Sequence, residues 1–188
     1  MAILGKIVLI GDGLVGKTTL RDRYLGRKFV SEYLPTLGSD FASKNVLIKT
    51  NLGWKEITFQ IWDLAGQPSF KQIRTMYYRQ AAGALVIFDV TLEESLYNLK
   101  KWLEELSKNV LRPKVALIIL GNKIDIRSDV SISAETAKKF IAEDIAPKFS
   151  YLDDDIIYLE TSAKTGENVD KAFHILGEKI LKISHTGR

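Results

Sequence analysis

The sequence predicts an α/β fold built on a mostly parallel six-stranded sheet, with one antiparallel edge strand and helices on both faces. Two continuous apolar runs, residues 84–88 and 115–120, are typical of strands that are buried on both faces of a parallel sheet. Amphipathic stripes separate the predicted strands, and this alternation favours a doubly wound sheet whose ligand binds at the carboxyl ends of the strands. At 188 residues the chain is long enough to bury a core, so we expect a single domain over residues 1–188.

The composition narrows the class of protein. Hydrophobic residues make up 46% of the chain and charged residues 27%, as in an ordinary globular protein. The formal net charge of +4 is too mild to argue for a nucleic-acid partner, and none is expected. The sequence contains no cysteine, which excludes disulfides, thiolate catalysis and cysteine metal sites. No apolar run is long enough for a membrane span or a signal peptide, so we expect a cytoplasmic protein.

Residues 11–18 carry the first chemical motif, G-x-x-x-x-G-K-[ST]. The β-branched run 6–10 predicts a buried strand before it, while Leu20 and Tyr24 lie one helical turn apart and indicate an amphipathic helix after it. Strand, glycine loop and helix together predict a P-loop, in which backbone N–H groups and a helix N-terminus surround a phosphate. The alternative is a glycine-rich turn with a surface lysine, which the flanking strand and helix disfavour. A P-loop NTPase fold is therefore expected.

The P-loop residues are expected to share the work of holding a triphosphate. Lys17 would reach the β- and γ-phosphates, and the hydroxyl of Thr18 would ligate Mg²⁺. The predicted ligand is thus a nucleotide with Mg²⁺ as its cofactor. The expected nucleotide contacts of this segment are Gly13, Leu14, Val15, Gly16, Lys17, Thr18 and Thr19.

The next part of the chain predicts a loop followed by a hairpin of two strands. Residues 26–38 show no sustained period and contain Gly and Pro, which predicts a long functional loop. Residues 41–50 predict a strand and 51–53 a hairpin turn. Beyond the turn, apolar and polar residues alternate from Ile57 onwards, which is typical of a half-buried strand. This alternation places Trp62 on the outer face, where it indicates a contact surface.

Asp63 ends that second strand, next to the predicted P-loop. A carboxylate at this position is suited to hold Mg²⁺, here through a water molecule. Gly66 allows a backbone N–H to approach the terminal phosphate, and Gln67 is placed to orient a water molecule. The alternative is a turn in which Asp63 acts only as a cap. The presence of the P-loop motif in the same chain disfavours this alternative.

The second half of the chain predicts the remaining helices and the last strand. A helical stripe covers residues 96–110, and Ser133 is placed to cap the helix that follows it. Residues 156–159 predict the last strand, and residues 169–180 predict a final amphipathic helix. Trp102, within the first stripe, is interpreted as packing.

The motif N-K-x-D at residues 122–125 follows a buried apolar run and is expected to select the base. A carboxylate only accepts hydrogen bonds, and guanine presents N1–H and an exocyclic amine side by side, so Asp125 can accept both. Adenine offers no such pair. Asn122 would brace the loops and contact the base, Lys123 would cover its face, and the Ala163 N–H would donate to O6.

Through these residues the chain resembles the Ras superfamily of small GTPases, and most closely its Rab branch. The Rab likeness is carried by residues 33–41, by residues 62–67 and by Tyr-Tyr-Arg at 77–79. The resemblance implies that Thr36 in the first switch ligates Mg²⁺ and senses the γ-phosphate, and that Gly66 and Gln67 form the second switch. It also implies a fifth guanine motif that supplies Ser162, Ala163 and Lys164.

The resemblance implies a GTP-hydrolysing switch with slow intrinsic hydrolysis that a partner accelerates. The implied catalytic residues are Gln67, Lys17, Gly66 and Thr36, and the implied metal ligands are Thr18, Thr36 and Asp63. Effectors, exchange factors and GTPase-activating proteins would bind the switch regions and the aromatic residues Phe41, Trp62 and Tyr77, and the protein would be a monomer. The alternative is a GTP-binding interaction module with impaired hydrolysis, whereas a P-loop kinase or ATPase lacks the guanine motifs.

Three features depart from the family pattern. The sequence has no cysteine at its end to prenylate, so either the protein carries no lipid anchor or the sequence is truncated. Pro68 stands where the family usually has an acidic residue, and it biases Gln67 towards an extended backbone. The segment 145–155 is longer than usual. It contains three consecutive aspartates without the spacing of a Ca²⁺ loop, so we expect a solvated acidic loop there.

Overall fold

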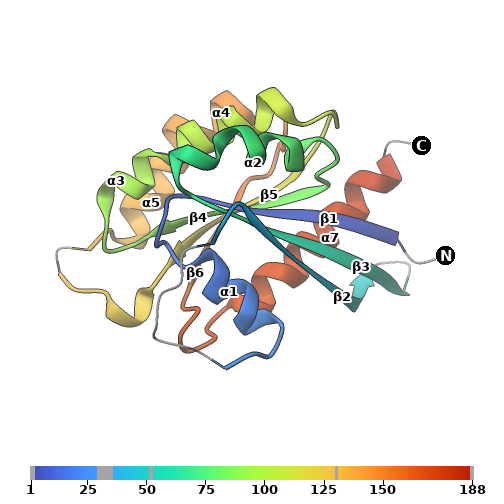
Figure 1. Ribbon diagram of the computed structural model, residues 1–188, viewed down its shortest axis with the longest axis horizontal. Helices are drawn as coiled ribbons and strands as arrows, with labels where there is room; N and C mark the ends of the chain where they lie inside the picture. Colours follow the sequence, from blue (N-terminus) through green and yellow to red (C-terminus); the bar gives the residue numbers. More distant parts are fainter. Residues whose placement is uncertain (1–2, 29–35, 51–52, 130, 187–188) are drawn as a thin grey trace.

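A computed structural model describes residues 3–28, 36–50, 53–129 and 131–186, with side chains described as far as residue 184 (Figure 1). The described residues form one six-stranded sheet in the order β2-β3-β1-β4-β5-β6. The strands are β1 (Ile3–Ile10), β2 (Ser39–Thr50), β3 (Gly53–Leu64), β4 (Gly83–Asp89), β5 (Ala116–Asn122) and β6 (Ile157–Thr161).

The direction of the strands confirms the predicted sheet. Neighbouring strands are parallel throughout except at one edge, where β2 runs antiparallel to β3. β1 lies between β3 and β4, so successive strands are added on opposite sides of it. In sheets of this kind the crevice at the carboxyl ends of the strands, where the order reverses, is the usual ligand site. The predicted P-loop directly follows β1 and therefore lies at this crevice.

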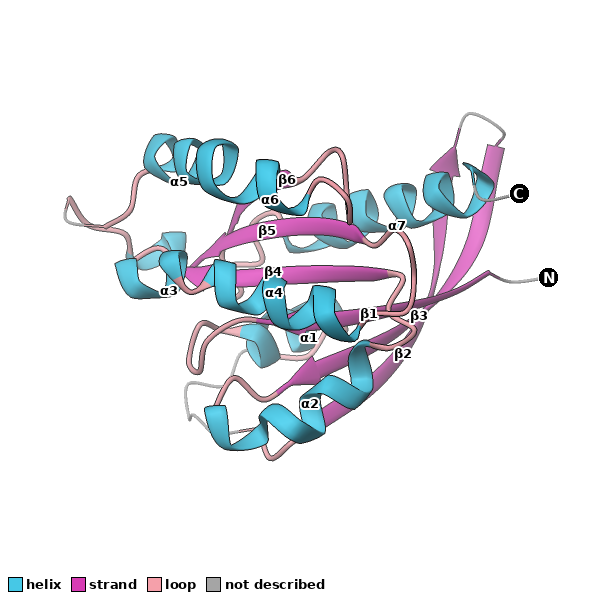
Figure 2. Cartoon of the chain, turned by 90° about the horizontal axis from the view of Figure 1, so that it is seen from above, coloured by secondary structure: helices cyan, strands magenta, loops and turns pink. Residues whose placement is uncertain are grey.

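Two hydrophobic layers cover the sheet. Successive residues of a strand point to opposite faces, so Val8 and Ile10 of β1 pack into the layer under α2 to α6, while Ile7 and Leu9 pack against α1 and α7. Figures 1 and 2 show these two groups of helices on opposite faces of the sheet. The helices are α1 (Lys17–Tyr24), α2 (Lys71–Tyr78), α3 (Glu93–Tyr97), α4 (Leu99–Asn109), α5 (Ala134–Phe140), α6 (Ala146–Phe149) and α7 (Val169–Thr186).

The predicted elements agree with the structure, with one refinement. The stripe at residues 96–110 divides into α3 and α4, which meet at Asn98. Ser133 caps α5 as predicted, because its hydroxyl accepts a hydrogen bond from the N–H of Thr136 (3.0 Å). Most of the predicted hairpin turn and of the loop between α1 and β2 falls on residues 51–52 and 29–35, which lie outside the described residues.

The segment 145–155 matches the expected solvated acidic loop at Asp154 and Asp155, which are exposed, but not at Asp153. It follows a π-helical turn (Ile141–Ile145), and its Asp153 is only 5% exposed. The Asp153 carboxylate accepts a hydrogen bond from the N–H of Leu117 (2.6 Å) and pairs with Lys179 of α7 (2.7 Å). The expectation is therefore wrong for Asp153, because the residues that bury it come from β5 and α7 and are distant in sequence. Losing one partner of such a buried pair typically costs about 3–5 kcal/mol.

Within the described ranges, no helix combines the length and the apolar character that crossing a membrane would require.

Candidate functional site

The P-loop closes over the ammonium group of Lys17. Its Nζ donates hydrogen bonds to the carbonyl oxygens of Gly11 (2.8 Å) and Asp12 (2.6 Å), and burial lowers the pKa of this lysine to about 8. Only glycine fits at position 16, because the φ of Gly16 is 96° and a Cβ there would lie 2.4 Å from Nδ2 of Asn122. In the described chain no side chain caps the start of α1, so its first N–H groups remain free for an anion.

Three side chains predicted to hold Mg²⁺ meet at the amino end of α1. The hydroxyls of Thr18 and Thr36 are 2.9 Å apart, the Thr18 hydroxyl donates to Oδ2 of Asp63, and Thr36 Oγ1 is 3.5 Å from the same oxygen. Asp63 is fully buried, burial raises its pKa, and its Oδ1 has no hydrogen-bond partner in the described residues. Two hydroxyls beside an unsatisfied, buried carboxylate oxygen are hard oxygen donors, which is the ligand set that Mg²⁺ prefers. These residues therefore fit the cation.

Arg21 is a neighbour of this group that sequence reasoning missed. Its side chain is 2% exposed and its Nη1 lies 2.7 Å from Asp40 and 3.9 Å from Asp63. Asp40 and Asp63 are directly opposite each other in the β2–β3 pair, where like charges repel. Arg21, which belongs to α1, places its positive charge near both carboxylates. No motif marks Arg21, because the need for it arises only when α1 packs on the hairpin.

The turn after β3 lies directly on the P-loop. A Cβ on Gly66 would be 2.5 Å from the carbonyl carbon of Asp12 and from the nitrogen of Gly13, so only glycine fits this approach. Gln67 has φ −72° and ψ 140°, the extended backbone predicted for a residue before proline, and Pro68 begins a short 3₁₀ turn (Pro68–Phe70). The side chain of Gln67 is exposed at the rim of the cavity.

The residues predicted to read the base are joined by hydrogen bonds at the ends of β5 and β6. Asn122 is fully buried; its Nδ2 donates to the Val15 carbonyl (2.9 Å), and its Oδ1 accepts from Thr161 (3.1 Å) and from the Ala163 N–H (3.1 Å). The Ala163 N–H is thus already engaged, and a donation to guanine O6 would be shared with Asn122. Asp125 accepts from the hydroxyl of Ser162 (2.6 Å), which orients its carboxylate.

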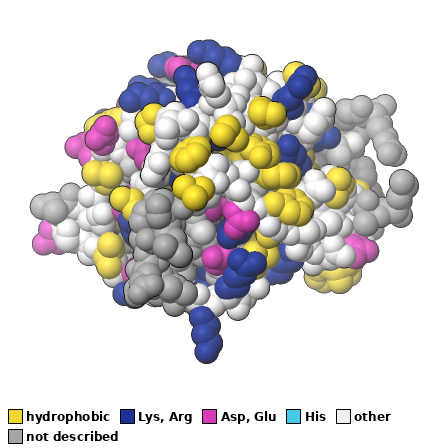
Figure 3. Space-filling model, in the orientation of Figure 1, with side chains coloured by type: hydrophobic (Ala, Val, Ile, Leu, Met, Phe, Trp, Pro, Cys, Tyr) yellow, Lys and Arg dark blue, Asp and Glu magenta, His cyan; other side chains and the backbone are white. Residues whose placement is uncertain are grey.

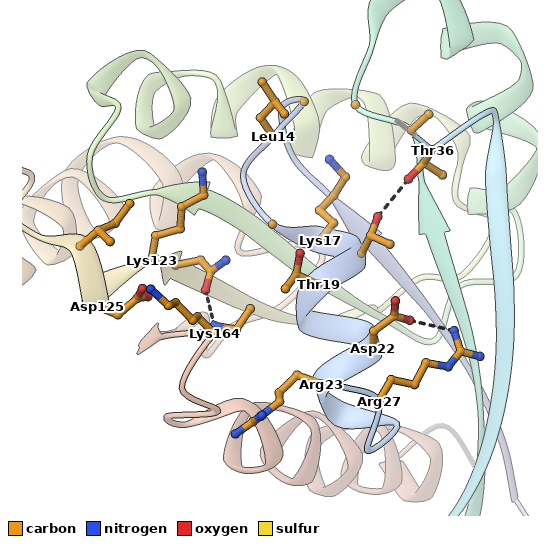
Figure 4. A pocket seen from close by; sticks show the side chains of 18 of the residues that line it. Leu14, Lys17, Thr19, Asp22, Arg23, Arg27, Thr36, Lys123, Asp125 and Lys164 are labelled. Carbon is orange, nitrogen blue, oxygen red and sulfur yellow. Dashed lines mark hydrogen bonds and ion pairs between the residues drawn. The ribbon is translucent and has the colours of Figure 1, made fainter. Parts of the chain in front are cut away.

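Lys123 has a left-handed backbone (φ 70°), and its Nζ pairs with Asp89 of β4 (2.7 Å). This ion pair fixes the end of the lysine side chain. In Figure 4 the side chain of Lys123 lies between Asp125 and the P-loop residues Leu14 and Lys17. Lys164 also lines the cavity.

One cavity of about 730 Å³ joins the P-loop to the residues predicted to read the base (Figure 4). Three of the predicted residues do not line it: Val15, Asp63 and Ser162 lie behind the surface and act on residues that do. The cavity also has lining residues that were not predicted. They are Asp22, Arg23, Arg27, Lys28, Ala65 and Ile126.

Phe41, Trp62 and Tyr77 form an aromatic cluster beside the switch segments. The ring of Trp62 lies 4.8 Å from that of Phe41 and 4.7 Å from that of Tyr77, and its outer-face position agrees with the strand period. Trp62 is half-buried rather than fully outward, because Tyr77 of α2 covers it. Figure 3 shows hydrophobic side chains gathered near the middle of this face of the molecule, beside lysines and arginines. The most exposed apolar residues near the switches are Leu37, Phe41, Ile73 and Met76.

The sheet order and a single cavity that begins at a P-loop define the class of P-loop nucleotide-binding proteins. Comparison with known proteins then gives the family. The sequence profile of the Ras family matches residues 6–182. GTP-binding protein YPT53 of Saccharomyces cerevisiae is 39% identical over 177 residues, covering 93% of this chain and 76% of the relative. The chain belongs to the Ras family of small GTPases.

Further relatives point to the Rab type within that family. Ras-related protein Rab-21 of Mus musculus is 36% identical over 177 residues, which cover 94% of this chain and 73% of the relative. Ras-related protein Rab-13 of Rattus norvegicus is 38% identical over 178 residues, which cover 95% and 80%, respectively. The likeness to the Rab branch that residues 33–41 and 62–67 indicated is thereby confirmed.

Proposed function

We propose that this protein is a Mg²⁺-dependent switch that binds and slowly hydrolyses GTP. The observation that carries the proposal is a cavity that extends from Lys17 at the P-loop to Asp125, which follows β5. Its volume of about 730 Å³ lies in the usual range for small-molecule sites. A nucleoside triphosphate has its anionic tail and its base at opposite ends, as the two ends of this cavity require.

The phosphate side would stabilise negative charge. An incoming oxyanion offers the ammonium of Lys17 a stronger partner than the carbonyls of Gly11 and Asp12, and it would raise the pKa of this lysine. Thr18, Thr36 and Asp63 would hold Mg²⁺, which when bound supplies charge neutralisation at the β- and γ-phosphate oxygens. Gly66 would direct its N–H at the γ-phosphate.

Hydrolysis would use Gln67 to orient the attacking water. The two arginines that line the cavity are held by other groups: Arg23 donates to the Thr165 carbonyl, and Arg27 pairs with Asp22, as Figure 4 shows for the latter. Neither is placed to supply positive charge to the transition state, so a partner protein would raise the rate by about 10³–10⁵-fold.

The switch would act through the segments that sense the γ-phosphate. Thr36 precedes β2 and Gly66 follows β3, and the two segments are joined by a hydrogen bond from the Ala65 N–H to the Gly38 carbonyl (3.0 Å). Loss of the γ-phosphate would release both segments and alter the adjoining aromatic cluster of Phe41, Trp62 and Tyr77. Effector, exchange and activating proteins would recognise this face, and the switch itself would be a monomer.

Gln67→Leu is expected to lower the single-turnover rate of GTP hydrolysis by about 10²-fold, because leucine cannot hydrogen-bond to the attacking water. The GDP dissociation rate should stay within about twofold of wild type. Hydrolysis is measured as phosphate release from preloaded protein. Gln72→Leu, an exposed glutamine of α2, is the matched control and should leave the rate unchanged.

The interaction module with impaired hydrolysis remains the second candidate because of Pro68, which holds Gln67 in an extended backbone. Pro68→Glu separates the two. If Gln67→Leu has no effect on the rate and Pro68→Glu raises it at least tenfold, the native protein binds GTP without using Gln67 and the module is the better description. If Gln67→Leu slows hydrolysis and Pro68→Glu changes little, the hydrolysing switch stands.

A further inference from the structure

Asp12, the second residue of the P-loop motif, is hydrogen-bonded to two residues of the helical segment that follows β4. Its Oδ1 accepts a hydrogen bond from the indole N–H of Trp102 (2.7 Å), and its Oδ2 accepts one from the side-chain amide of Asn98 (2.7 Å). Trp102 is 6% exposed. The interpretation of Trp102 as simple packing is therefore incomplete, because its polar edge is bonded to the P-loop.

The other side of Trp102 is covered by a buried arginine. The guanidinium carbon of Arg74 lies 4.5 Å from the centre of a Trp102 ring, and the Arg74 side chain is 3% exposed. Its Nε and Nη2 form a two-point contact with Glu105 of α4 (2.7 and 3.0 Å), which also accepts from the hydroxyl of Tyr78 (2.8 Å). Arg74 is thus held firmly between α2 and α4.

The third guanidinium nitrogen of Arg74 is hydrogen-bonded to the turn that carries Gln67. Its Nη1 donates to the carbonyl oxygens of Ala65 (2.7 Å) and Gln67 (2.9 Å), the residues on either side of Gly66. A peptide unit is planar and trans, so its carbonyl and its N–H point in opposite directions. By holding the Ala65 carbonyl, Arg74 turns the Gly66 N–H away from α4. By holding the Gln67 carbonyl, it fixes the backbone angle from which the Gln67 side chain extends.

The contacts form a closed ring beside the P-loop end of the cavity. From Asp12 they run through Trp102 and Arg74 to the turn at 65–67, and that turn returns to Asp12 because Gly66 packs on the Asp12–Gly13 peptide. Asp12, Trp102 and Arg74 do not line the cavity, whereas Gly13 and the turn at 65–67 do. These three residues can therefore affect hydrolysis without contacting the nucleotide.

We propose that Asp12, Trp102 and Arg74 are positioning residues for GTP hydrolysis. From the side of α4 they hold Gly66 and Gln67 in place against the P-loop. This inference rests on the proposed function. It assigns the contact between α2 and α4 a part in the reaction, and it predicts that changes in this contact alter the rate of hydrolysis more than the affinity for nucleotide.

The test compares two variants that leave no buried charge unpaired. Arg74→Met combined with Glu105→Gln keeps the volume of the pair and removes both charges, and Trp102→Phe keeps an aromatic ring under Arg74 and removes the N–H that Asp12 accepts. We expect the double variant to lower the single-turnover rate of GTP hydrolysis about 10- to 100-fold, and Trp102→Phe to lower it less. The dissociation rate of a fluorescent GDP should stay within about twofold of wild type for both.

Matched controls lie nearby and outside the ring. Arg79→Met removes an exposed arginine that follows α2, and Trp54→Phe removes a tryptophan that is 63% exposed on β3. Both should leave hydrolysis and GDP dissociation at wild-type rates. Arg74→Lys, within the ring, can still donate to one of the two carbonyls. It should hydrolyse GTP faster than the double variant and more slowly than wild type.

The outcomes separate this inference from the proposed function. If wild-type protein hydrolyses GTP and Gln67→Leu slows it, but the double variant matches wild type, the positioning role is overturned and the switch stands. A loss of GDP affinity as large as the loss of rate would show a structural role only, and would also overturn it. If wild-type protein neither binds nor hydrolyses GTP, the proposed function itself fails.

Discussion

Asp125→Asn is expected to lower the affinity for GDP by about 10³-fold and to create affinity for xanthosine diphosphate. In the structure the Asp125 carboxylate lies at the base end of the cavity and is oriented by the hydroxyl of Ser162 (2.6 Å). Guanine offers two donors, N1–H and the exocyclic amine, which a carboxylate accepts and an amide cannot accept together. Two charge-assisted hydrogen bonds are worth about 1.5–3 kcal/mol each, which gives the expected loss. Xanthine replaces the amine by a carbonyl, which the amide N–H₂ of asparagine can satisfy.

The measurement is a titration of nucleotide-free protein with GDP, xanthosine diphosphate and ADP. Asp129→Asn makes the same chemical change at an exposed position on the loop that follows, and should leave all three affinities unchanged. A variant at Asp125 that keeps the wild-type preference for GDP would show that another group reads the base.

Thr18→Asn is expected to reduce the affinity for GTP in the presence of Mg²⁺ by at least about 10²-fold, and to reduce the affinity for GDP much less. The Thr18 hydroxyl is shared between Thr36 (2.9 Å) and Asp63, and it is the only one of the three that also belongs to the P-loop motif. Even groups that only orient a metal ligand contribute about 10–100-fold to affinity, so a lost ligand should cost at least as much. Binding to GDP depends less on the cation because there is no γ-phosphate to neutralise.

Thr18→Ser is the matched control, because it keeps the hydroxyl and removes only a methyl group. Its affinities should stay near those of wild type, and titration with Mg²⁺ at fixed nucleotide should give the same midpoint. If Thr18→Asn binds GTP and Mg²⁺ as wild type does, Thr18 does not belong to the metal site.

Much of the fold was predictable because its signals are local. The apolar runs of β4 and β5 and the alternation that starts at Ile57 each depend on neighbouring residues, and the glycine loop lies directly between a strand and a helix. Parallel strands then bring their carboxyl ends to one edge, which is why Lys17 and Asp125, 108 positions apart, line the same cavity.

The remainder depends on tertiary contacts between residues that share no motif. The role of Arg21 depends on the packing of α1 against the Asp40–Asp63 pair. The burial of Asp153 likewise depends on its ion pair with Lys179 of α7. Trp102 has the spacing of a core residue, so the helical stripe could not reveal its hydrogen bond to Asp12. In each case a buried polar group had to find a partner, and the fold rather than the local sequence supplies that partner.

The nucleotide that wild-type protein carries after purification tests the central claim most directly. The protein is denatured, and the released nucleotide is identified and quantified by chromatography, with and without prior chelation of Mg²⁺. We predict one guanine nucleotide per chain, mostly GDP, that is lost faster once Mg²⁺ is removed. An adenine nucleotide, or an empty protein that also fails to take up added GDP, would contradict a site in which Lys17 and Asp125 hold the two ends of one guanine nucleotide.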